Sequence, residues 1–341
     1  MRRRTRISIK LALLALLLVA AAAVAQDSQY KIRAKIDLVV VPVTVKGSGD
    51  RLISGLTQKD FVIFEDGHQQ TISNFTADPV PLSAAVVVDT GLSAGSLSKV
   101  QKTFPALAGA FSQYDEVAVY QYDKFVTKLL DFSNNTERVE AAMNKLREVK
   151  PDANLALATN PNSPFGVQGP VINGFPVLPP GANGTIQTVP PKPTKVLNDA
   201  IMTAVSDLVR RERTRRKMIL VISDGISSGS DHSFEETSRS LLETGIQVYA
   251  VGLDQPFVYK KVSVLEDYAK TTGGDAYFVK SIQNIEKSYA VAAEEARNQY
   301  ILGYVSNNEV KGAGPVFRDI KVEIADANYK TLHRKGYYQY P

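Results

Sequence analysis

Cysteine is absent from the 341-residue sequence, and long apolar runs are absent after its first 25 residues. The lack of cysteine excludes disulfide bonds, thiolate metal sites and thiol nucleophiles, so the folded chain must be held together by its core. The lack of a second long apolar run excludes a bilayer-spanning helix beyond the start of the sequence.

The excess of basic residues is confined to the beginning of the sequence. The chain has 40 Lys and Arg against 35 Asp and Glu, and five of these cations, with no acid, lie within residues 1–25. That segment combines a basic start, an apolar stretch and the small residues Ala23-Val24-Ala25, which predicts a cleaved secretory signal peptide. A retained membrane anchor is the alternative, but about 15 apolar residues make a short span. We therefore expect an exported protein, periplasmic, on the cell surface or secreted.

The remaining chain has 35 acidic and 35 basic residues, and so no net charge. This balance gives no support for nucleic-acid binding. The strongest local charge run is "RRERTRRK", residues 210–217. It suits an anionic polymer or lipid head groups, although the solvated end of a helix is the favoured interpretation.

Two segments near the ends of the sequence are typical of β-structure. Residues 31–79 contain valine-rich alternation and an Asp66-Gly67 turn between apolar runs, which predicts a hairpin. Residues 299–341 return to the same kind of pattern. We expect the two segments to pair in one small β-sandwich-like domain built from both chain ends.

Residues 80–298 alternate apolar strands with amphipathic helices, including a helix expected over 96–112 that contains Pro105. This alternation predicts right-handed crossovers and a doubly wound, mostly parallel sheet covered on both faces. The predicted fold class is therefore α/β, with this domain inserted into the β-sandwich-like domain. Residues 151–194 interrupt it with a stretch dense in Pro, Gly and Asn, interpreted either as a recognition loop or as a passive insertion.

Two aspartates come directly after apolar strands. Asp89 ends "SAAVVVD", and Asp224 follows "KMILVIS". Binding sites in sheets of this kind lie beyond the carboxyl ends of the strands. We therefore expect Asp89 and Asp224 to lie on the same rim of the sheet.

The segments "VVVDTGLS" and "ILVISDG" resemble the von Willebrand factor A domain. That family has a metal-ion-dependent adhesion site, with Asp-x-Ser-x-Ser after the first strand, a Thr in a second loop and an Asp after a later strand. The resemblance implies a Mg²⁺ (or Mn²⁺) ion held by Asp89, Ser93, Thr194 and Asp224, which takes an acidic side chain of a protein partner as its last ligand. Seven segments between residues 36 and 338 look together like the acidobacterial VWFA-related family: "VPVTV", "GLTQKDFVIFEDG", "DTGLS", "TGGDAYF", "RNQYILGY", "FRDIKVE" and "RKGYY".

The sequence departs from the family pattern at two positions. Gly91 stands where the motif has its first serine, and Lys195 stands at the place of the threonine, one residue after Thr194. A lysine there would point a cation at a cation site. Ser96 is a substitute hydroxyl, but we expect it to cap the helix that follows. The site is thus open to three interpretations: a working metal site, a weakened one that fills only with a partner, and a rim without metal.

The favoured function is protein recognition or adhesion through this partly degenerate site, without enzymatic activity. One alternative is a metal-independent scaffold whose site is vestigial. The other is a metal-assisted hydrolase, against which stands the lack of a cluster of His, Cys or Glu near the rim. A Ser-His-Asp triad would instead need a histidine beside a nucleophile. Of the three histidines, His68, His232 and His333, only His232 falls near the rim, where Ser93 would be the nucleophile.

Overall fold

The computed structural model describes residues 38–150, 171–172, 175–176, 194–253, 263–309 and 312–341. The predicted signal peptide and nearly all of the 151–194 segment lie outside the described residues. Residues Leu38–Pro341 form one compact unit. No helix in the described part of the chain is both long and apolar enough to cross a membrane.

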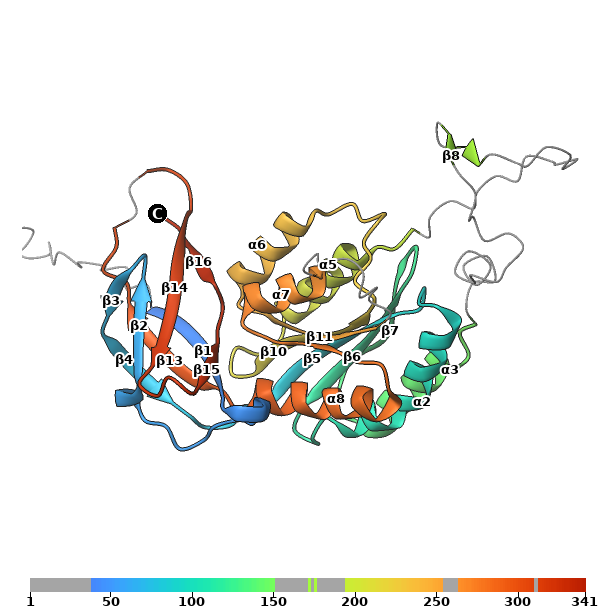
Figure 1. Cartoon of the computed structure of the whole chain (residues 1–341), viewed down its shortest axis with the longest axis horizontal. Coiled ribbons are helices and arrows are strands. Elements are labelled where there is room, and N and C mark those ends of the chain that lie inside the picture. Colours follow the sequence, from blue (N-terminus) through green and yellow to red (C-terminus); the bar gives the residue numbers. More distant parts are fainter. Residues whose placement is uncertain (1–37, 151–170, 173–174, 177–193, 254–262, 310–311) are drawn as a thin grey trace, which may run out of the picture. The chain divides into compact units, whose positions relative to one another are not determined.

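A six-stranded sheet of order β12-β11-β10-β5-β6-β7 forms the α/β part of the chain (Figure 1). Neighbouring strands are parallel except for the antiparallel pair β6 and β7. Every residue of β5 is buried, because helices cover both faces of the sheet, and this explains its uninterrupted apolar run. The strands are β5 (Leu82–Asp89), β6 (Glu116–Tyr122), β7 (Val126–Ser133), β10 (Arg216–Ser223), β11 (Gln247–Gly252) and β12 (Ala276–Phe278).

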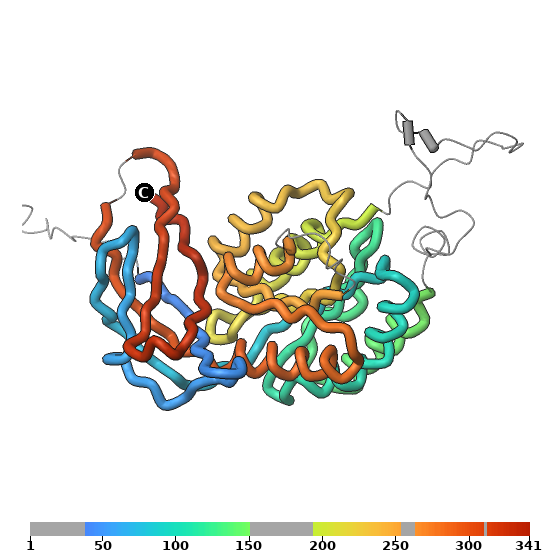
Figure 2. Tube along the Cα trace, viewed as in Figure 1, coloured from blue at the N-terminus to red at the C-terminus, as the bar shows by residue number. Residues whose placement is uncertain are grey.

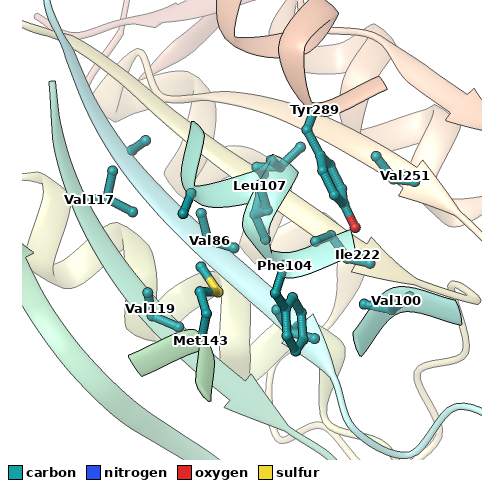
Figure 3. Close-up of a cluster of buried hydrophobic side chains, with 14 of the residues drawn as sticks. Val86, Val100, Phe104, Leu107, Val117, Val119, Met143, Ile222, Val251 and Tyr289 are labelled. Carbon is teal, nitrogen blue, oxygen red and sulfur yellow. The ribbon is translucent and has the colours of Figure 1, made fainter. Parts of the chain in front are cut away.

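The helices divide between the two faces of this sheet (Figure 1). Val86 and Val88 of β5 pack into a cluster with α2 (Ala94–Gly109), α3 (Thr136–Arg147) and α8 (Ile282–Arg297). Figure 3 shows Phe104, Leu107 and Tyr289 of that cluster around Val86. Ala85 and Val87 pack on the other face, against α5 (Leu197–Leu208), α6 (Phe234–Thr244) and α7 (Val264–Thr272). The predicted α/β class is confirmed.

Both chain ends contribute to two further antiparallel sheets, of order β15-β1-β13-β4 and β16-β14-β2-β3. Figure 2 shows the blue and red segments side by side, as the pairing of β1 with β13 requires. Valines of β1 and apolar residues of β2, β13 and β14 share one core, so the two sheets pack face to face. Their strands are β1 (Leu38–Lys46), β2 (Phe61–Glu65), β3 (His68–Gln70), β4 (Ile72–Thr76), β13 (Tyr300–Val305), β14 (Val316–Ile324), β15 (Lys330–Leu332) and β16 (Gly336–Gln339).

Among the described residues, the shorter elements are two 3₁₀ turns, Ser48–Asp50 and Gln58–Asp60, and one small pair of strands, β8 (Val171–Ile172) and β9 (Phe175–Pro176). The predicted turn at Asp66-Gly67 is confirmed, with both residues at positive φ between β2 and β3.

The start of α2 differs from the prediction. We expected Ser96 to cap a helix over 96–112, but the helix begins at Ala94 and ends at Gly109. Ser93 is the capping residue: its backbone is non-helical, and its Oγ accepts a hydrogen bond from the backbone N–H of Ser96 at 3.3 Å. The earlier start gives the Ser93 hydroxyl a structural partner only four residues after Asp89.

Candidate functional site

The ends of β5 and β10 bring Asp89 and Asp224 together. The two strands are adjacent and parallel, with Val88 opposite Ile222, so the residues that follow them emerge at the same edge of the sheet. Asp89 is the last residue of β5, and Asp224 comes directly after β10. The predicted shared rim is therefore present.

The ammonium group of Lys195 lies between these two carboxylates. Its Nζ is 2.9 Å from Oδ2 of Asp89 and 2.6 Å from Oδ2 of Asp224. The side chains of Lys195, Asp89 and Asp224 are 2%, 0% and 12% exposed, so all three charges are largely removed from water. We call Asp89, Lys195 and Asp224 the rim triad. It is an internal ion cluster with one positive and two negative charges.

Backbone hydrogen bonds from two loops hold Lys195 in place. Its carbonyl oxygen accepts from the N–H groups of Ser228 and Gly229, and its own N–H donates to Oγ of Ser228. The next residue, Val196, donates its N–H to the carbonyl oxygen of Asp123. The loops after β6 and β10 therefore fix the segment that carries the ammonium just before α5 begins.

The carboxylate of Asp89 has a full set of donors. Its Oδ1 accepts from the N–H of Gly91 at 2.9 Å, and its Oδ2 accepts from the hydroxyl of Ser223 at 3.1 Å as well as from Lys195. The Ser223 hydroxyl also lies 2.6 Å from the buried hydroxyl of Tyr122. These bonds compensate for the burial of the carboxylate, which would otherwise cost several kcal/mol.

Gly91 and Lys195, the two departures from the family motif, are close neighbours in the fold. A Cβ atom at position 91 would lie 3.2 Å from Cε of Lys195 and 3.4 Å from Oδ1 of Asp89. A serine at position 91 would therefore crowd the lysine stem. The missing side chain at one position makes room for the long side chain at the other.

The other two predicted ligands lie outside the triad. Ser93 caps α2, as described above. Thr194 is exposed, and its methyl group lies so near Gly229 that a Cβ there would be 2.0 Å from it. The methyl group of Thr194 thus packs against the loop after β10, while the side chain of the next residue, Lys195, enters the rim.

A divalent cation does not fit between Asp89 and Asp224 in this arrangement, because the ammonium of Lys195 lies in that space. No group of three or more His, Cys, Asp or Glu suited to a metal ion occurs in the described part of the chain. Metal binding by Asp89, Ser93, Thr194 and Asp224 stays a prediction, and it requires Lys195 to move.

Burial raises the pKa of Asp89 to about 6: the ammonium of Lys195 opposes this rise, and the negative charge of Asp224 adds to it. Burial also opposes the charge on Lys195, but the two carboxylates outweigh it and hold the pKa of the ammonium above its usual value. The triad therefore retains its cation throughout the range in which Asp89 titrates.

This raised pKa predicts a pH dependence of stability. In the unfolded chain the pKa of Asp89 is about 3.9. The folded protein thus binds this proton more tightly, so the contribution of Asp89 is complete below pH 4 and is lost as the pH rises through about 6. The expected loss in the free energy of unfolding is about 3 kcal/mol.

Urea denaturation of the wild type and of Asp89→Asn between pH 4 and pH 7 measures this effect. We expect the variant, which cannot titrate at this position, to show a flatter profile. Asp131→Asn, at an exposed position of β7, is the control and should keep the wild-type slope. Equal slopes for Asp89→Asn and the wild type would contradict the assignment.

Two large apolar side chains are exposed beside the rim triad. Phe125, 77% exposed, lies in the turn between β6 and β7, the same turn that binds Val196 through Asp123. Ile226 is 47% exposed, and its N–H donates to Oδ1 of Asp224 at 2.9 Å. Large apolar side chains exposed on one surface are typical of protein-binding sites.

His232 has a partner other than a candidate nucleophile. Its Nδ1 lies 2.7 Å from Oδ1 of Asp199 in α5, and the backbone N–H of His232 donates to the same oxygen. The pair joins the loop before α6 to the first turn of α5. The contacts of His232 are therefore those of a loop-anchoring residue.

The fold and the rim together define the class of this domain. It is a doubly wound α/β domain with acidic residues at the carboxyl ends of its strands. The family model of the von Willebrand factor type A domain matches residues 184–291. The chain therefore contains a von Willebrand factor type A domain. The matched range includes Lys195 and Asp224, while Asp89 precedes it. None of the curated proteins compared with the chain matches it significantly.

Several solved structures are similar in fold. BatB from Bacteroides thetaiotaomicron, described as a conserved hypothetical protein, is 13% identical with a TM-score of 0.38, over 62% of this chain and 99% of its own. A von Willebrand factor type A protein from Catenulispora acidiphila is 7% identical with a TM-score of 0.45, over 88% and 73%. Proximal thread matrix protein 1 from the mussel byssus, in a form with a zinc-occupied MIDAS motif, is 14% identical with a TM-score of 0.39, over 64% and 48%.

Proposed function

We propose that this chain is an interaction module that binds a protein partner at the rim triad, with the Lys195 ammonium in the place of a divalent cation. The observation that carries the proposal is the position of Nζ, within 3 Å of both rim carboxylates. Von Willebrand factor type A domains generally act as interaction modules, and the comparison with that family supports the same role here.

The charge of the triad indicates what kind of partner it suits. One ammonium and two carboxylates leave a net charge of −1 when all three are ionised. A rim that contained a metal ion would attract an acidic side chain of the partner. The rim triad does not attract one, because its own net charge is negative. The complementary partner places apolar side chains against Phe125 and Ile226 and a basic side chain near the triad.

The remaining parts of the proposal come from the sequence. We propose that the protein is exported after cleavage of residues 1–25 and acts in adhesion or recognition in the periplasm, at the surface or outside the cell. We also propose membership of the acidobacterial VWFA-related family, with the α/β domain at 80–298 between β-segments at 31–79 and 299–341. The hydrolase alternative gains no support from His232, which is paired with Asp199.

Partner capture from periplasmic and surface extracts tests this function. We expect capture by the wild type to survive a chelator and to fall roughly 10- to 100-fold in Phe125→Asp/Ile226→Asp, because the two apolar anchors together contribute about 2 kcal/mol. The matched control is Tyr114→Asp, since Tyr114 is 68% exposed and precedes β6, at the opposite end of the sheet.

Circular dichroism of each variant establishes that it is folded. Release of the partner by chelator would contradict a metal-independent rim. Capture that depends on Tyr114 and not on Phe125 and Ile226 would place the binding surface elsewhere.

A further inference from the structure

A cleft of about 930 Å³ lies at the end of the parallel sheet opposite to the rim triad. Arg216, the first residue of β10, lines it, whereas Asp224 follows the last residue of the same strand. The other walls come from β1, from the loop between α5 and β10, from the end of α6 and from Arg334. This volume is in the range of small-molecule sites in proteins.

Two arginines of this cleft have no counter-charge. The Nε atoms of Arg216 and Arg334 are buried and lack a hydrogen-bond partner, and neither guanidinium forms an ion pair with any residue that the structure describes. The guanidinium of Arg334 lies 5.6 Å from the ring centroid of Tyr337, a contact that supplies no acceptor. A guanidinium has five N–H donors, and burying it unpaired is unfavourable. Burial accordingly lowers the pKa of both arginines.

Two other arginines of the same charge run, unlike Arg216, have partners within the fold. Arg211 forms two hydrogen bonds with the carboxylate of Glu116, and Arg215 donates to the carbonyl oxygens of Leu82 and Tyr114. The sequence favoured a solvated helix end for the whole run at 210–217. The structure differs, because these arginines do not all point into solvent. Part of the run is compensated within the fold, and Arg216 is directed into the cleft without compensation.

The cleft as a whole is positively charged. Lys217 lines it, and burial together with Arg213 and Arg211 lowers the pKa of Lys217. The acid among the lining residues is Glu243, which is already bonded to Arg239 and to the hydroxyl of Tyr340. The cleft thus offers several cationic donors and leaves them no carboxylate of its own.

Apolar side chains line the same cleft and are unusually exposed. Leu38 and Val40 of β1 are 51% and 41% exposed, and Val209, directly after α5, is 49% exposed. Leu38 and Val40 lie on the face of β1 that points away from the shared core, since the alternate residues Val39 and Val41 are buried in it. A ligand that covers them needs an apolar part as well as a charged one.

We propose that this cleft binds a small amphipathic anion, with a carboxylate or phosphate head at Arg216 and Arg334 and an apolar chain against Leu38, Val40 and Val209. Guanidinium groups match the planar geometry of both heads and bind them through paired hydrogen bonds. The site is separate from the rim triad and does not depend on the interaction proposed for it.

Calorimetry on the full chain with decanoate and with decyl phosphate, each below its micelle concentration, tests the proposal. We expect one site per chain for at least one of the two, and the tighter of them identifies the head. Acetate and inorganic phosphate should bind at least 10-fold more weakly, because they lack the chain, and decanol should not bind, because it lacks the charge.

Arg216→Gln and Arg334→Gln are each expected to weaken binding at least 10-fold. Their unfolding midpoints in urea without ligand should not fall, because the guanidinium groups have no ion pair to lose among the described residues and the substitution removes an uncompensated buried charge. Arg138→Gln, at an exposed position of α3, is the control and should bind as the wild type does.

Absence of heat with both amphipaths would overturn the proposal, as would undiminished binding in both arginine variants. Equal affinity for decanoate and acetate would overturn the apolar half of the site. A lower unfolding midpoint in Arg216→Gln would show that this arginine has a structural role instead.

Discussion

Replacing Lys195 with methionine is expected to lower the free energy of unfolding by about 3–5 kcal/mol at pH 7.5. Methionine retains most of the length of the stem but removes the charge, so Asp89 and Asp224 face each other without a cation. Both are largely buried, and like charges at short range in a poorly solvated site repel strongly. Urea denaturation followed by far-ultraviolet circular dichroism measures the change.

Lys102→Met is the matched control, because Lys102 is exposed on α2 and its loss should change stability little. The effect of Lys195→Met should also be smaller at pH 5, where Asp89 takes up a proton and removes one of the two charges. A loss below about 1 kcal/mol at pH 7.5 would mean that the ammonium is not the cation of the rim.

A companion variant tests whether the lysine replaces a metal. Gly91→Ser with Lys195→Thr restores both hydroxyls of the family motif and removes the side chain that fills the site. We expect this double variant to bind Mg²⁺ in calorimetry and to gain thermal stability from it, while the wild type does neither. Heat from Mg²⁺ binding to the wild type, abolished by Asp224→Ala, would instead support the metal site predicted from the sequence.

Replacing Lys46 with methionine should have a comparable effect, about 3–5 kcal/mol, through a second buried ion cluster. Lys46 ends β1, is 1% exposed, and forms ion pairs with Asp275, at 2.6 Å, and with Glu295 of α8. Glu295 is fully buried, so the loss of Lys46 leaves its carboxylate without a counter-charge and beside that of Asp275. The cluster connects β1, a strand of the antiparallel sheet β15-β1-β13-β4, to the α/β part of the fold.

The control for this variant is Lys330→Met, because Lys330 is exposed on β15 directly opposite Lys46. Adding Glu295→Gln to Lys46→Met should recover part of the stability, since it removes the uncompensated charge. If the double variant were less stable than Lys46→Met alone, the two side chains would not act as a pair.

The arrangement of helices and strands could be predicted because each follows from a local pattern. The run at 84–88 predicts a strand covered on both faces, and β5 is buried on both. The start of α2 could not be predicted to within a few residues, since Ser93 and Ser96 are both good capping residues and only the backbone geometry after β5 selects Ser93.

The rim was only partly predictable. Asp89 and Asp224 could be placed on one edge, because the carboxyl ends of parallel strands meet there. The role of Lys195 could not be inferred from its own position, where a cation looked unfavourable. The available signal was the combination of Gly91 and Lys195. Its meaning depends on the fold, because a Cβ at position 91 would lie 3.2 Å from Cε of Lys195, a residue about one hundred positions away.

The sequence by itself therefore determined the fold class and the two carboxylates of the rim, because strand periodicity and strand ends are local properties. Only the tertiary structure decided which cation lies between those carboxylates, which arginines of the 210–217 run lack a counter-charge, and that Lys46 joins β1 to α8. The physical reason is the same in each case. The cost of a buried charge depends on which distant side chains surround it, and only the folded chain brings those side chains together.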